Sequence, residues 1–183
     1  MDVRVNADLT GLNTFGFAST AKYLCLVEDS KSLQEAILLA KQEGLPLFVL
    51  GGGSNLVLDA ELEAVVVKLC DQSVVIEHES EAGVSVSVGA GKSWHEWVEE
   101  SIANGWYGLE NLALIPGTVG AAPVQNIGAY GVELKDCLEY LEVWDTQRDR
   151  LVKIQAAECD FGYRQSRFKY QDAGRYIILR VVF

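Results

Sequence analysis

The sequence predicts a mixed domain of the α+β or α/β class, because helix signals and strand signals are interspersed along its 183 residues. Two segments combine a helix start signal with an apolar stripe, and several short apolar runs have the length of strands. No repeat or low-complexity tract is visible in the sequence. The length suffices for one substantial domain or for two lobes that share a core, and we place a possible division at residues 1–72 and 73–183.

Two helices are predicted from capping-box spacings. The first begins at Ser32–Glu35. Its apolar face comprises Leu33, Ala36, Ile37 and Ala40, and Gly44 and Pro46 mark its end. The second begins at Ser93–Glu96, its apolar face comprises Trp94, Trp97, Val98 and Ile102, and Gly105 marks its end. We interpret the tryptophans as core residues and His95 as a surface residue.

Short apolar runs predict the strands. They are Tyr23–Val27, Leu47–Leu50, Ala64–Leu69, Val74–His78, Val84–Val88, Leu138–Trp144, Leu151–Ile154 and Tyr176–Phe183. Val84–Val88 alternates valine with serine, so we expect it to form a hairpin with Val74–His78. The last run reaches the final residue without a polar tail, which fits either a natural terminus or a truncation.

The composition excludes several classes of partner. A net charge of −11 argues against nucleic acid, because phosphate backbones bind basic surfaces. The cysteines form no C-x-x-C pair and the two histidines lie far apart, so we expect reduced thiols and no metal site. The absence of a leader and of a long apolar run favours a cytoplasmic protein with no membrane partner. A small phosphorylated ligand is still compatible, because backbone N–H groups bind phosphate without lysine.

Two glycine-rich segments imitate nucleotide-binding motifs without completing them. Gly89–Ser93 ends like a P-loop, but Val86 stands where that motif requires its first glycine. Gly51–Leu56 begins like the dinucleotide fingerprint and lacks its last glycine. The sequence therefore favours neither a P-loop nor a Rossmann site.

The triglycine segment Gly51–Gly53 nevertheless has features of a phosphate site. It follows a predicted buried strand and precedes Ser54 and Asn55, which carry side-chain donors. Glycines permit unusual backbone angles and close approach by a ligand, and successive N–H groups can form a nest for a pyrophosphate. The alternative is a plain β-turn, for which one glycine would suffice.

Three later segments are further candidates for a ligand site. Pro116–Pro123 is rich in small residues, and Gln125–Gly131 adds amides that could hydrogen-bond the heteroatom edge of a ring system. A tightly packed glycine loop is the structural alternative. Phe161–Lys169 gathers basic and aromatic residues in an otherwise acidic chain. Either this segment is a solvated turn with surface ion pairs, or Arg164 binds a carboxylate or a developing oxyanion.

Together these segments resemble the UDP-N-acetylenolpyruvoylglucosamine reductases. The matching blocks are Asn13–Gly16, Leu50–Asn55, Gly108–Gly117, Val119–Pro123, Gln125–Gly131 and Phe161–Arg164 with Ser166, Phe168 and Lys169. Because several blocks in family order are more specific than any single motif, the chain is identified as a member of this family.

The resemblance implies the two-lobed α+β FAD-binding domain of vanillyl-alcohol-oxidase/PCMH-type flavoenzymes over residues 1–183. It also implies a step of peptidoglycan precursor synthesis. NADPH reduces FAD, and hydride then passes to the enolpyruvyl double bond of UDP-N-acetylglucosamine enolpyruvate, giving UDP-N-acetylmuramate. The family's proton-donating serine lies in a Gly-Ser-Phe-Phe block that this sequence lacks. We therefore expect the family's C-terminal substrate-binding domain to be absent from this chain, and the chain alone to be inactive.

The resemblance also implies roles for individual residues. Gly51, Gly53, Ser54 and Asn55 would hold the pyrophosphate of FAD. Ile115, Gly117, Ala121, Val124, Gly128 and Ile178 would line the cofactor, and Tyr130 would lie beside it near the substrate. Arg164 matches the family's catalytic arginine, whose guanidinium stabilises the negative charge that develops on the substrate after hydride addition.

Three alternative interpretations are kept. A free-standing FAD-binding module without reductase activity would carry the cofactor blocks but would not need Arg164. A covalent-flavin oxidase of the same fold would need a histidine or cysteine at the flavin, and neither histidine lies in a cofactor block. A P-loop enzyme would bind Mg-ATP, so the absorption spectrum of the purified protein would distinguish it from a flavoprotein.

Overall fold

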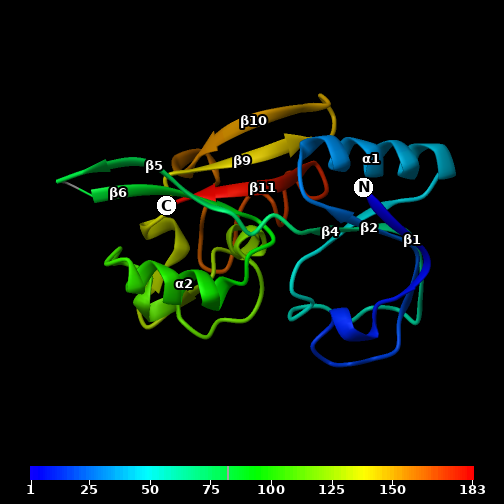
Figure 1. The fold of residues 1–183 in the computed structure, drawn as a ribbon, viewed down its shortest axis with the longest axis horizontal. Helices are drawn as coiled ribbons and strands as arrows, with labels where there is room; N and C mark the ends of the chain where they lie inside the picture. Colours follow the sequence, from blue (N-terminus) through cyan, green and yellow to red (C-terminus); the bar gives the residue numbers. More distant parts are fainter. Residues whose placement is uncertain (82) are drawn as a thin grey trace. The chain divides into compact units, whose positions relative to one another are not determined.

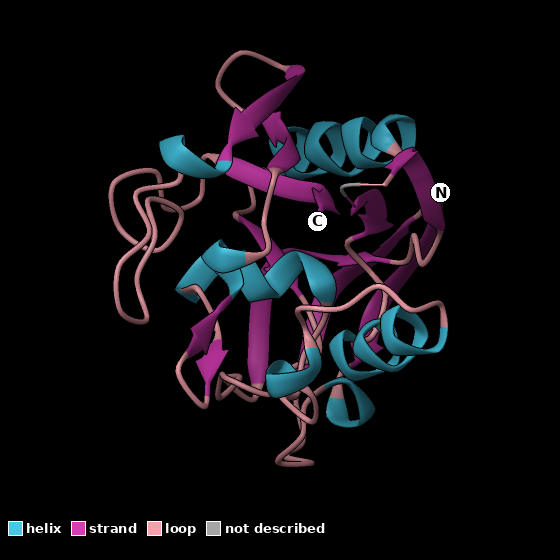
Figure 2. Cartoon of the chain, turned by 90° about the vertical axis from the view of Figure 1, so that its left-hand side faces the viewer, coloured by secondary structure: helices cyan, strands magenta, loops and turns pink. Residues whose placement is uncertain are grey.

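The computed structural model describes residues 1–81 and 83–183, which form two compact units, Met1–Asp71 and Gln72–Phe183 (Figure 1). Each unit has a sheet and a hydrophobic core of its own. Helices and strands are interspersed along the chain and are joined by many loops (Figure 2), as expected for a mixed α and β protein.

The first unit is built on a four-stranded sheet in the order β1-β2-β4-β3. Its strands are β1 (Asp2–Asp8), β2 (Thr20–Val27), β3 (Leu47–Leu50) and β4 (Glu61–Leu69). β1 pairs antiparallel with β2, whereas β2 and β3 both pair parallel with β4. The helix α1 (Ser30–Glu43) connects β2 to β3 and packs on β2 and β4. The triglycine segment directly follows the carboxyl end of β3, the edge at which open parallel sheets bind ligands.

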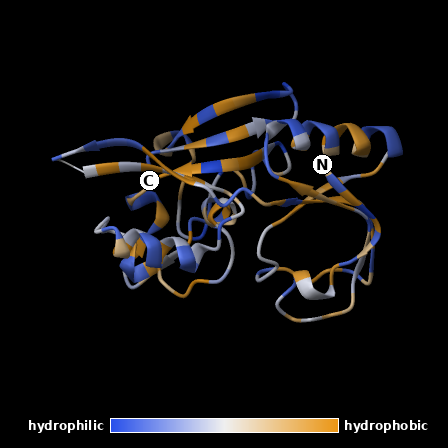
Figure 3. Cartoon of the chain, in the orientation of Figure 1, coloured by the Kyte–Doolittle hydropathy of each residue, from blue (hydrophilic) through white to orange (hydrophobic). Residues whose placement is uncertain are grey.

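The start of α1 differs from the prediction, whereas its end agrees. The N-cap is Asp29, whose carboxylate accepts the backbone N–H of Ser32 at 2.7 Å, and Ser32 Oγ accepts the N–H of Asp29 at 3.1 Å. The predicted capping box at Ser32–Glu35 is therefore wrong, because an upstream aspartate serves as an equally good acceptor and lengthens the helix. Gly44 is the C-cap with φ +67°, as predicted. The predicted apolar face is buried, and Figure 3 shows hydrophobic and hydrophilic residues alternating along α1.

The second unit is built on a five-stranded antiparallel sheet in the order β10-β9-β11-β6-β5. Its strands are β5 (Val74–Ser80), β6 (Gly83–Gly89), β9 (Tyr140–Asp145), β10 (Arg150–Gln155) and β11 (Tyr176–Val182). The predicted hairpin is confirmed, because β5 pairs antiparallel with β6. A separate two-stranded ribbon joins β7 (Gly128–Ala129) to β8 (Val132–Glu133).

Two helical segments cover one face of this sheet. They are α2 (Trp94–Ala103) and the 3-10 helix η3 (Val119–Gln125). Trp94 and Trp97 are both 1% exposed and belong to the core, as predicted. Ser93 is the N-cap of α2, but its side chain makes no capping hydrogen bond, so the second predicted capping box does not form. Ile102 is 41% exposed and lies outside the core, because the buried face of the last turn is supplied by Ser101.

Several elements escape prediction because they bury few apolar residues. In β1 only Ala7 is buried, since the strand lies at the edge of its sheet and alternates valines with charged and polar residues. The short 3-10 helices η1 (Thr10–Leu12), η2 (Glu110–Leu112), η4 (Leu134–Asp136) and η5 (Ala156–Glu158) lack an apolar stripe. Among the described residues, no helix is both long enough and apolar enough to cross a bilayer.

Candidate functional site

The triglycine turn, residues 51–55, contains hydrogen-bond donors that have no acceptor among the described residues. Three hydrogen bonds hold its backbone: Lys68 Nζ donates to the carbonyl of Gly51 at 3.2 Å, and the N–H and the hydroxyl of Thr14 donate to the carbonyl of Gly53 at 3.1 and 3.4 Å. The backbone N–H groups of the turn, and the side chains of Ser54 and Asn55, donate to no acceptor among the described residues. Because consecutive free N–H groups form an anion-binding nest, this donor set fits a pyrophosphate.

Gly53 is glycine for a reason within the protein itself. Its φ is +66°, and a Cβ built there would lie 2.0 Å from the carbonyl oxygen of Leu12 and 2.8 Å from Cα of Asn13. Asn13 is buried, and its amide donates to the carbonyls of Leu9 and Phe17 at 3.1 and 3.0 Å. The close contact at Gly53 is thus made by the Leu12–Asn13 backbone and not by a ligand, and this contact supports the turn.

In the second unit, the start of η3 is hydrogen-bonded to the segment that follows β6. The N–H of Gly120 donates to the carbonyl of Ala90 at 3.0 Å, and the N–H of Val119 donates to that of Lys92 at 2.9 Å. A Cβ on Gly120 would lie 2.5 Å from Cβ of Ala90, so only glycine fits this contact. Lys92 Nζ lies 2.7 Å from a carboxylate oxygen of Glu100. The segment that resembles the end of a P-loop therefore supports η3.

Arg164 lies in a tight turn. Gly162 and Gln165 exchange two backbone hydrogen bonds of 3.1 Å, and Arg164 between them has φ +55°. Its guanidinium donates through Nη2 to the carbonyl of Gly128 at 2.9 Å. The side chain is exposed and forms no ion pair with any described residue. Its positive charge is therefore available to an anionic ligand.

Two further hydrogen bonds dock this turn against the loop that contains Gly128. Asn126 donates through Nδ2 to the carbonyl of Gly162 at 3.1 Å and accepts the N–H of Lys135 through Oδ1 at 3.1 Å. Ser166 Oγ donates to the carbonyl of Val124 at 2.6 Å. Asn126 is fully buried. The expectation that its amide faces a ring system is thus wrong, because both ends of the amide bind the protein backbone.

Backbone conformations with positive φ occur in both of these segments. Asn126 has φ +43°, Tyr130 has φ +50° and Arg164 has φ +55°. Such angles are uncommon in residues other than glycine, and they persist where the surrounding contacts hold them. Clusters of this kind occur at ligand sites, which points to the region between η3 and the Arg164 turn.

The structure divides the predicted site residues into two groups, one in each unit. Gly51, Gly53, Ser54 and Asn55 lie together in the triglycine turn of the first unit. In the second unit, Ile115 and Val124 pack against the core that contains Ile178, Gly117 precedes η3, Ala121 lies in it, and Gly128 contacts Arg164. Tyr130 is 90% exposed in the two-residue turn between β7 and β8.

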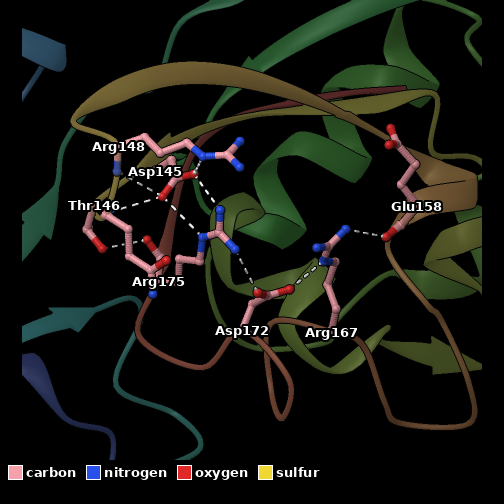
Figure 4. A network of polar contacts seen from close by, with 8 residues as sticks. Asp145, Thr146, Arg148, Glu158, Arg167, Asp172 and Arg175 are labelled. Atoms are coloured by element: carbon pink, nitrogen blue, oxygen red, sulfur yellow. Dashed lines mark hydrogen bonds and ion pairs between the residues drawn. The ribbon is translucent and has the colours of Figure 1, made fainter.

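A buried ion-pair network that the sequence does not predict joins Asp145 and Arg175 to Asp172 and Arg167 (Figure 4). Arg175 donates through Nη2 and Nε to the carboxylate of Asp145 at 2.8 and 3.2 Å. Asp172 accepts from Nη1 of Arg175 at 3.4 Å and from Nε of Arg167 at 2.7 Å. The Asp145 side chain is 1% exposed, and hydrogen bonding to Arg175 lowers its pKa to about 2. Arg167, Asp172 and Arg175 lie close together in an irregular segment, but Asp145 lies 30 residues before Arg175, so no local pattern reveals the network.

The resolved thiol pKa values of this chain are raised by burial. Burial raises the pKa of the Cys159 thiol to about 12 and raises that of Cys25. Among the described residues, no cluster of three or more His, Cys, Asp or Glu side chains could hold a metal ion.

Comparison with known proteins identifies the family. Residues 21–155 match the family model of the FAD binding domain. The chain belongs to this family. As an FAD binding domain, it shares its fold with a VAO-type flavoprotein from Myceliophthora thermophila, which is 14% identical with a TM-score of 0.60 over 90% of this chain and 31% of that structure. The predicted VAO/PCMH-type fold is thereby confirmed.

The predicted resemblance to the UDP-N-acetylenolpyruvoylglucosamine reductases is also confirmed. The reductase of Pseudomonas aeruginosa is 45% identical over 99% of this FAD binding domain and 53% of its own length. The crystal structure of the corresponding reductase from Thermus caldophilus superimposes with a TM-score of 0.77 at 31% identity, covering 98% of this chain and 60% of that one. The chain spans about half the length of the curated relatives it matches.

Proposed function

We propose that this chain is the FAD-binding part of a UDP-N-acetylenolpyruvoylglucosamine reductase. The observation that carries the proposal is the 45% identity to the Pseudomonas aeruginosa reductase over 99% of the chain. The donor set of the triglycine turn and the uncompensated charge of Arg164 supply the local chemistry that such a function needs.

The triglycine turn is the proposed seat of the FAD pyrophosphate. Gly51 and Gly53 offer backbone N–H groups, and Ser54 and Asn55 add an hydroxyl and an amide, all without a protein acceptor among the described residues. Backbone donors hold an anion without a lysine, which suits a chain with a net charge of −11. Lys68 donates a hydrogen bond to the carbonyl of Gly51 and so helps to fix the backbone of the turn.

The proposed wall for the flavin is the small and apolar surface of the second unit. Its proposed members are Ile115, Gly117, Ala121, Val124 and Gly128, with Ile178 buried in the core against which Ile115 and Val124 pack. The exposed Tyr130 is proposed to lie next to the bound cofactor. Gly120 and Ala90 bring η3 close to the sheet, so this surface is backed by close packing. A rigid apolar wall orients a planar ring and excludes water from it.

FAD held by these residues would supply the hydride chemistry, with NADPH as the proposed hydride donor and the enolpyruvyl double bond of UDP-N-acetylglucosamine enolpyruvate as the proposed acceptor. Arg164 binds the substrate carboxylate and stabilises the negative charge that spreads onto it when hydride adds. A guanidinium that is already in place contributes without reorganisation, and its two parallel N–H groups match a carboxylate. The Gly128 carbonyl holds Nη2 of Arg164 at 2.9 Å and so limits the orientation of the guanidinium.

The product of this reaction, UDP-N-acetylmuramate, is a precursor of peptidoglycan, and we place the reaction in the cytoplasm. The proton that completes it is assigned to a serine of the family's substrate-binding domain. We therefore propose that residues 1–183 bind FAD but do not turn over substrate by themselves.

A spectroscopic titration tests the cofactor assignment. Purified chain incubated with excess FAD and then desalted should show flavin absorption, and denaturation should release free FAD into the supernatant. Folded protein that stays colourless would reject the assignment. The reductase assignment is tested in a full-length protein that carries this chain, where NADPH consumption should require the enolpyruvyl substrate.

A further inference from the structure

The ion-pair network of Asp145, Arg175, Asp172 and Arg167 closes a long irregular segment that carries Arg164. Residues 159–175 connect η5 to β11 without a helix or strand of their own. A loop of this length has many accessible conformations unless side-chain contacts restrict it. The placement of Arg164 therefore depends on what ties the two ends of this segment together.

The network holds this segment through contacts at its start, in its middle and at its end. At the first end, Arg167 donates through Nη1 to the carbonyl of Glu158 at 2.8 Å, and its N–H donates to the carbonyl of Cys159 at 2.9 Å. In the middle, Asp172 joins Arg167 to Arg175 through its two carboxylate oxygens. At the far end, Arg175 binds the carboxylate of Asp145, the last residue of β9. A continuous chain of contacts thus runs from the start of the segment to the sheet (Figure 4).

Burial makes this network stiff. The side chains of Asp145 and Asp172 are 1% and 8% exposed, and those of Arg167 and Arg175 are each 21% exposed. Both guanidiniums also lie over the ring of Tyr176, at 4.6 Å for Arg175 and 5.6 Å for Arg167. Partly buried, bidentate pairs restrict side-chain motion far more than exposed pairs do.

The charges of these four residues balance one another, and the exposed Arg148 approaches Asp145 from outside the set, at 3.9 Å. Two carboxylates neutralise two guanidiniums, so neither Arg167 nor Arg175 is left to compete for an anionic ligand. Arg164 lies three residues before Arg167 and forms no ion pair with any described residue. The network therefore separates two structural arginines from the one whose charge faces outward.

We infer that Asp145, Arg175, Asp172 and Arg167 are positioning residues that hold the Arg164 turn against the Val124–Gly128 loop. The inference rests on the proposed function of Arg164. The effect passes from Asp172 through Arg167 to the Gly162–Ser166 stretch, whose docking contacts are the hydrogen bonds of Asn126, Ser166 and Arg164 itself. Asp145, Asp172 and Arg175 make none of these docking hydrogen bonds. They can therefore influence the charge that develops on the substrate only through the position of the Arg164 turn.

The test is a double-mutant cycle in a full-length reductase that carries this chain. Asp172→Asn keeps the shape of the side chain and removes the shared charge. Stopped-flow measurement should show reoxidation of the reduced flavin by the enolpyruvyl substrate slowed about 10- to 100-fold, the scale expected for a misplaced catalytic group. Flavin reduction by NADPH and the Kd for FAD should stay within about twofold, because neither involves Arg164.

The cycle is completed in the Arg164→Met background. In that background, adding Asp172→Asn should not slow flavin reoxidation any further than Arg164→Met alone does. A residue that acts only by positioning Arg164 has no effect once the guanidinium is gone. Arg148→Met is the matched control, since Arg148 also approaches Asp145, at 3.9 Å, but is 61% exposed and lies outside the segment. It should leave both half-reactions unchanged. If Asp172→Asn fails to fold, Arg167→Lys provides the same test. A lysine keeps the positive charge but cannot bind Asp172 and the Glu158 carbonyl at the same time as the guanidinium does.

Each other outcome overturns the inference. Additive losses in the double variant, or equal slowing of both half-reactions, would mean that the network supports the fold in general and not the turn. An unchanged reoxidation rate in Asp172→Asn, with an active parent enzyme, would reject the inference and leave the proposed function standing. A parent enzyme that transfers no hydride to the enolpyruvyl substrate would reject both.

Discussion

The triglycine turn of the first unit and the Arg164 turn of the second unit reach similar backbone conformations by different means. Gly53 and Arg164 have φ angles of +66° and +55°. In the first turn, glycine adopts the angle at no steric cost, and the adjacent backbone of Leu12 and Asn13 fills the space of the missing side chain. In the second turn, an arginine adopts it because hydrogen bonds from Asn126 and Ser166 hold the loop.

The difference separates a site made of backbone from a site made of side chains. Free N–H groups next to a strand can bind a phosphate wherever the local sequence permits the turn. The guanidinium of Arg164, which we propose binds a carboxylate, is held by another segment through the Gly128 carbonyl. In our inference its position also depends on Asp145 of β9, through Arg175. The first kind of site should therefore be sensitive to a single added methyl group, and the second to the loss of a single charge.

The largest effect is expected at Arg164. In a full-length reductase, Arg164→Met should slow flavin reoxidation by the enolpyruvyl substrate about 100- to 1000-fold, the usual scale for removing one stabiliser of developing charge. The rate of flavin reduction by NADPH should change little. Arg164→Lys should recover only part of the reoxidation rate, because an ammonium group cannot bind a carboxylate through two parallel N–H groups as a guanidinium does. Stopped-flow measurement of the two half-reactions gives both values. Equal slowing of the two would place Arg164 in a structural role and remove the contrast between the turns.

The second effect concerns the backbone of the triglycine turn. Gly53→Ala should lower the free energy of unfolding by about 2–4 kcal/mol, from a left-handed alanine and a clash with the Leu12 carbonyl. Gly16 is the matched control, because it has the same φ of +66° and nothing within 4 Å of an added Cβ. Gly16→Ala should cost only about 1 kcal/mol. Urea denaturation of the two variants measures the difference, and equal costs would show that the Leu12 contact yields without strain.

A third effect is a pH dependence that belongs to the side-chain network. The pKa of Asp145 is about 2, below its ordinary value of 3.8, so the unfolded chain binds a proton first as the pH falls. The pair with Arg175 thus contributes its full stability above about pH 4 and loses it as the pH drops toward 2, a change of roughly 2 kcal/mol. Unfolding followed by circular dichroism from pH 5 to pH 2 measures this loss. Asp145→Asn should flatten that part of the curve, and an unaltered slope in the variant would assign the loss to other carboxylates.

The smallest effect is expected from single donors of the triglycine turn. Ser54→Ala and Asn55→Ala should each raise the Kd for FAD about 2- to 10-fold, because one hydrogen bond among several is lost while the backbone donors stay. Fluorescence titration with FAD gives the Kd values. Asn104→Ala is the control, since Asn104 belongs to the second unit, its amide donates to the carbonyl of Glu100, and it is not one of the predicted site residues. Unchanged affinity in both turn variants would remove their side chains from the proposed pyrophosphate seat.

Much of the fold follows from local patterns. Leu47–Leu50 is observed with the predicted bounds, the β5–β6 hairpin pairs as its valine alternation indicates, and Gly44 ends α1. The errors lie where two local signals compete. Asp29 displaces Ser32 as the cap of α1, and β1 is hidden because an edge strand need not be apolar.

The candidate site was predictable in its parts and not in its assembly. The glycine, amide and arginine segments stand out by composition, and Arg164 and Gly128 prove to be in contact although 36 residues apart. The sequence predicts that amides of the Gln125–Gly131 segment can bind a ring system, yet both ends of the Asn126 amide bind protein backbone. Nothing in the spacing of Asp145, Arg167, Asp172 and Arg175 signals a network, because ion pairs across a fold have no sequence period.

By itself, the sequence determined the class of fold, the positions of most strands and the turn that offers free backbone donors, because these depend on neighbours along the chain. Only the tertiary structure decided why Gly53 must be glycine, since the carbonyl of Leu12 comes from another segment. It likewise decided which arginine is free. Arg164, Arg167 and Arg175 are alike as side chains, and they differ because Asp145 and Asp172 neutralise two of them across a folded segment and leave the third exposed.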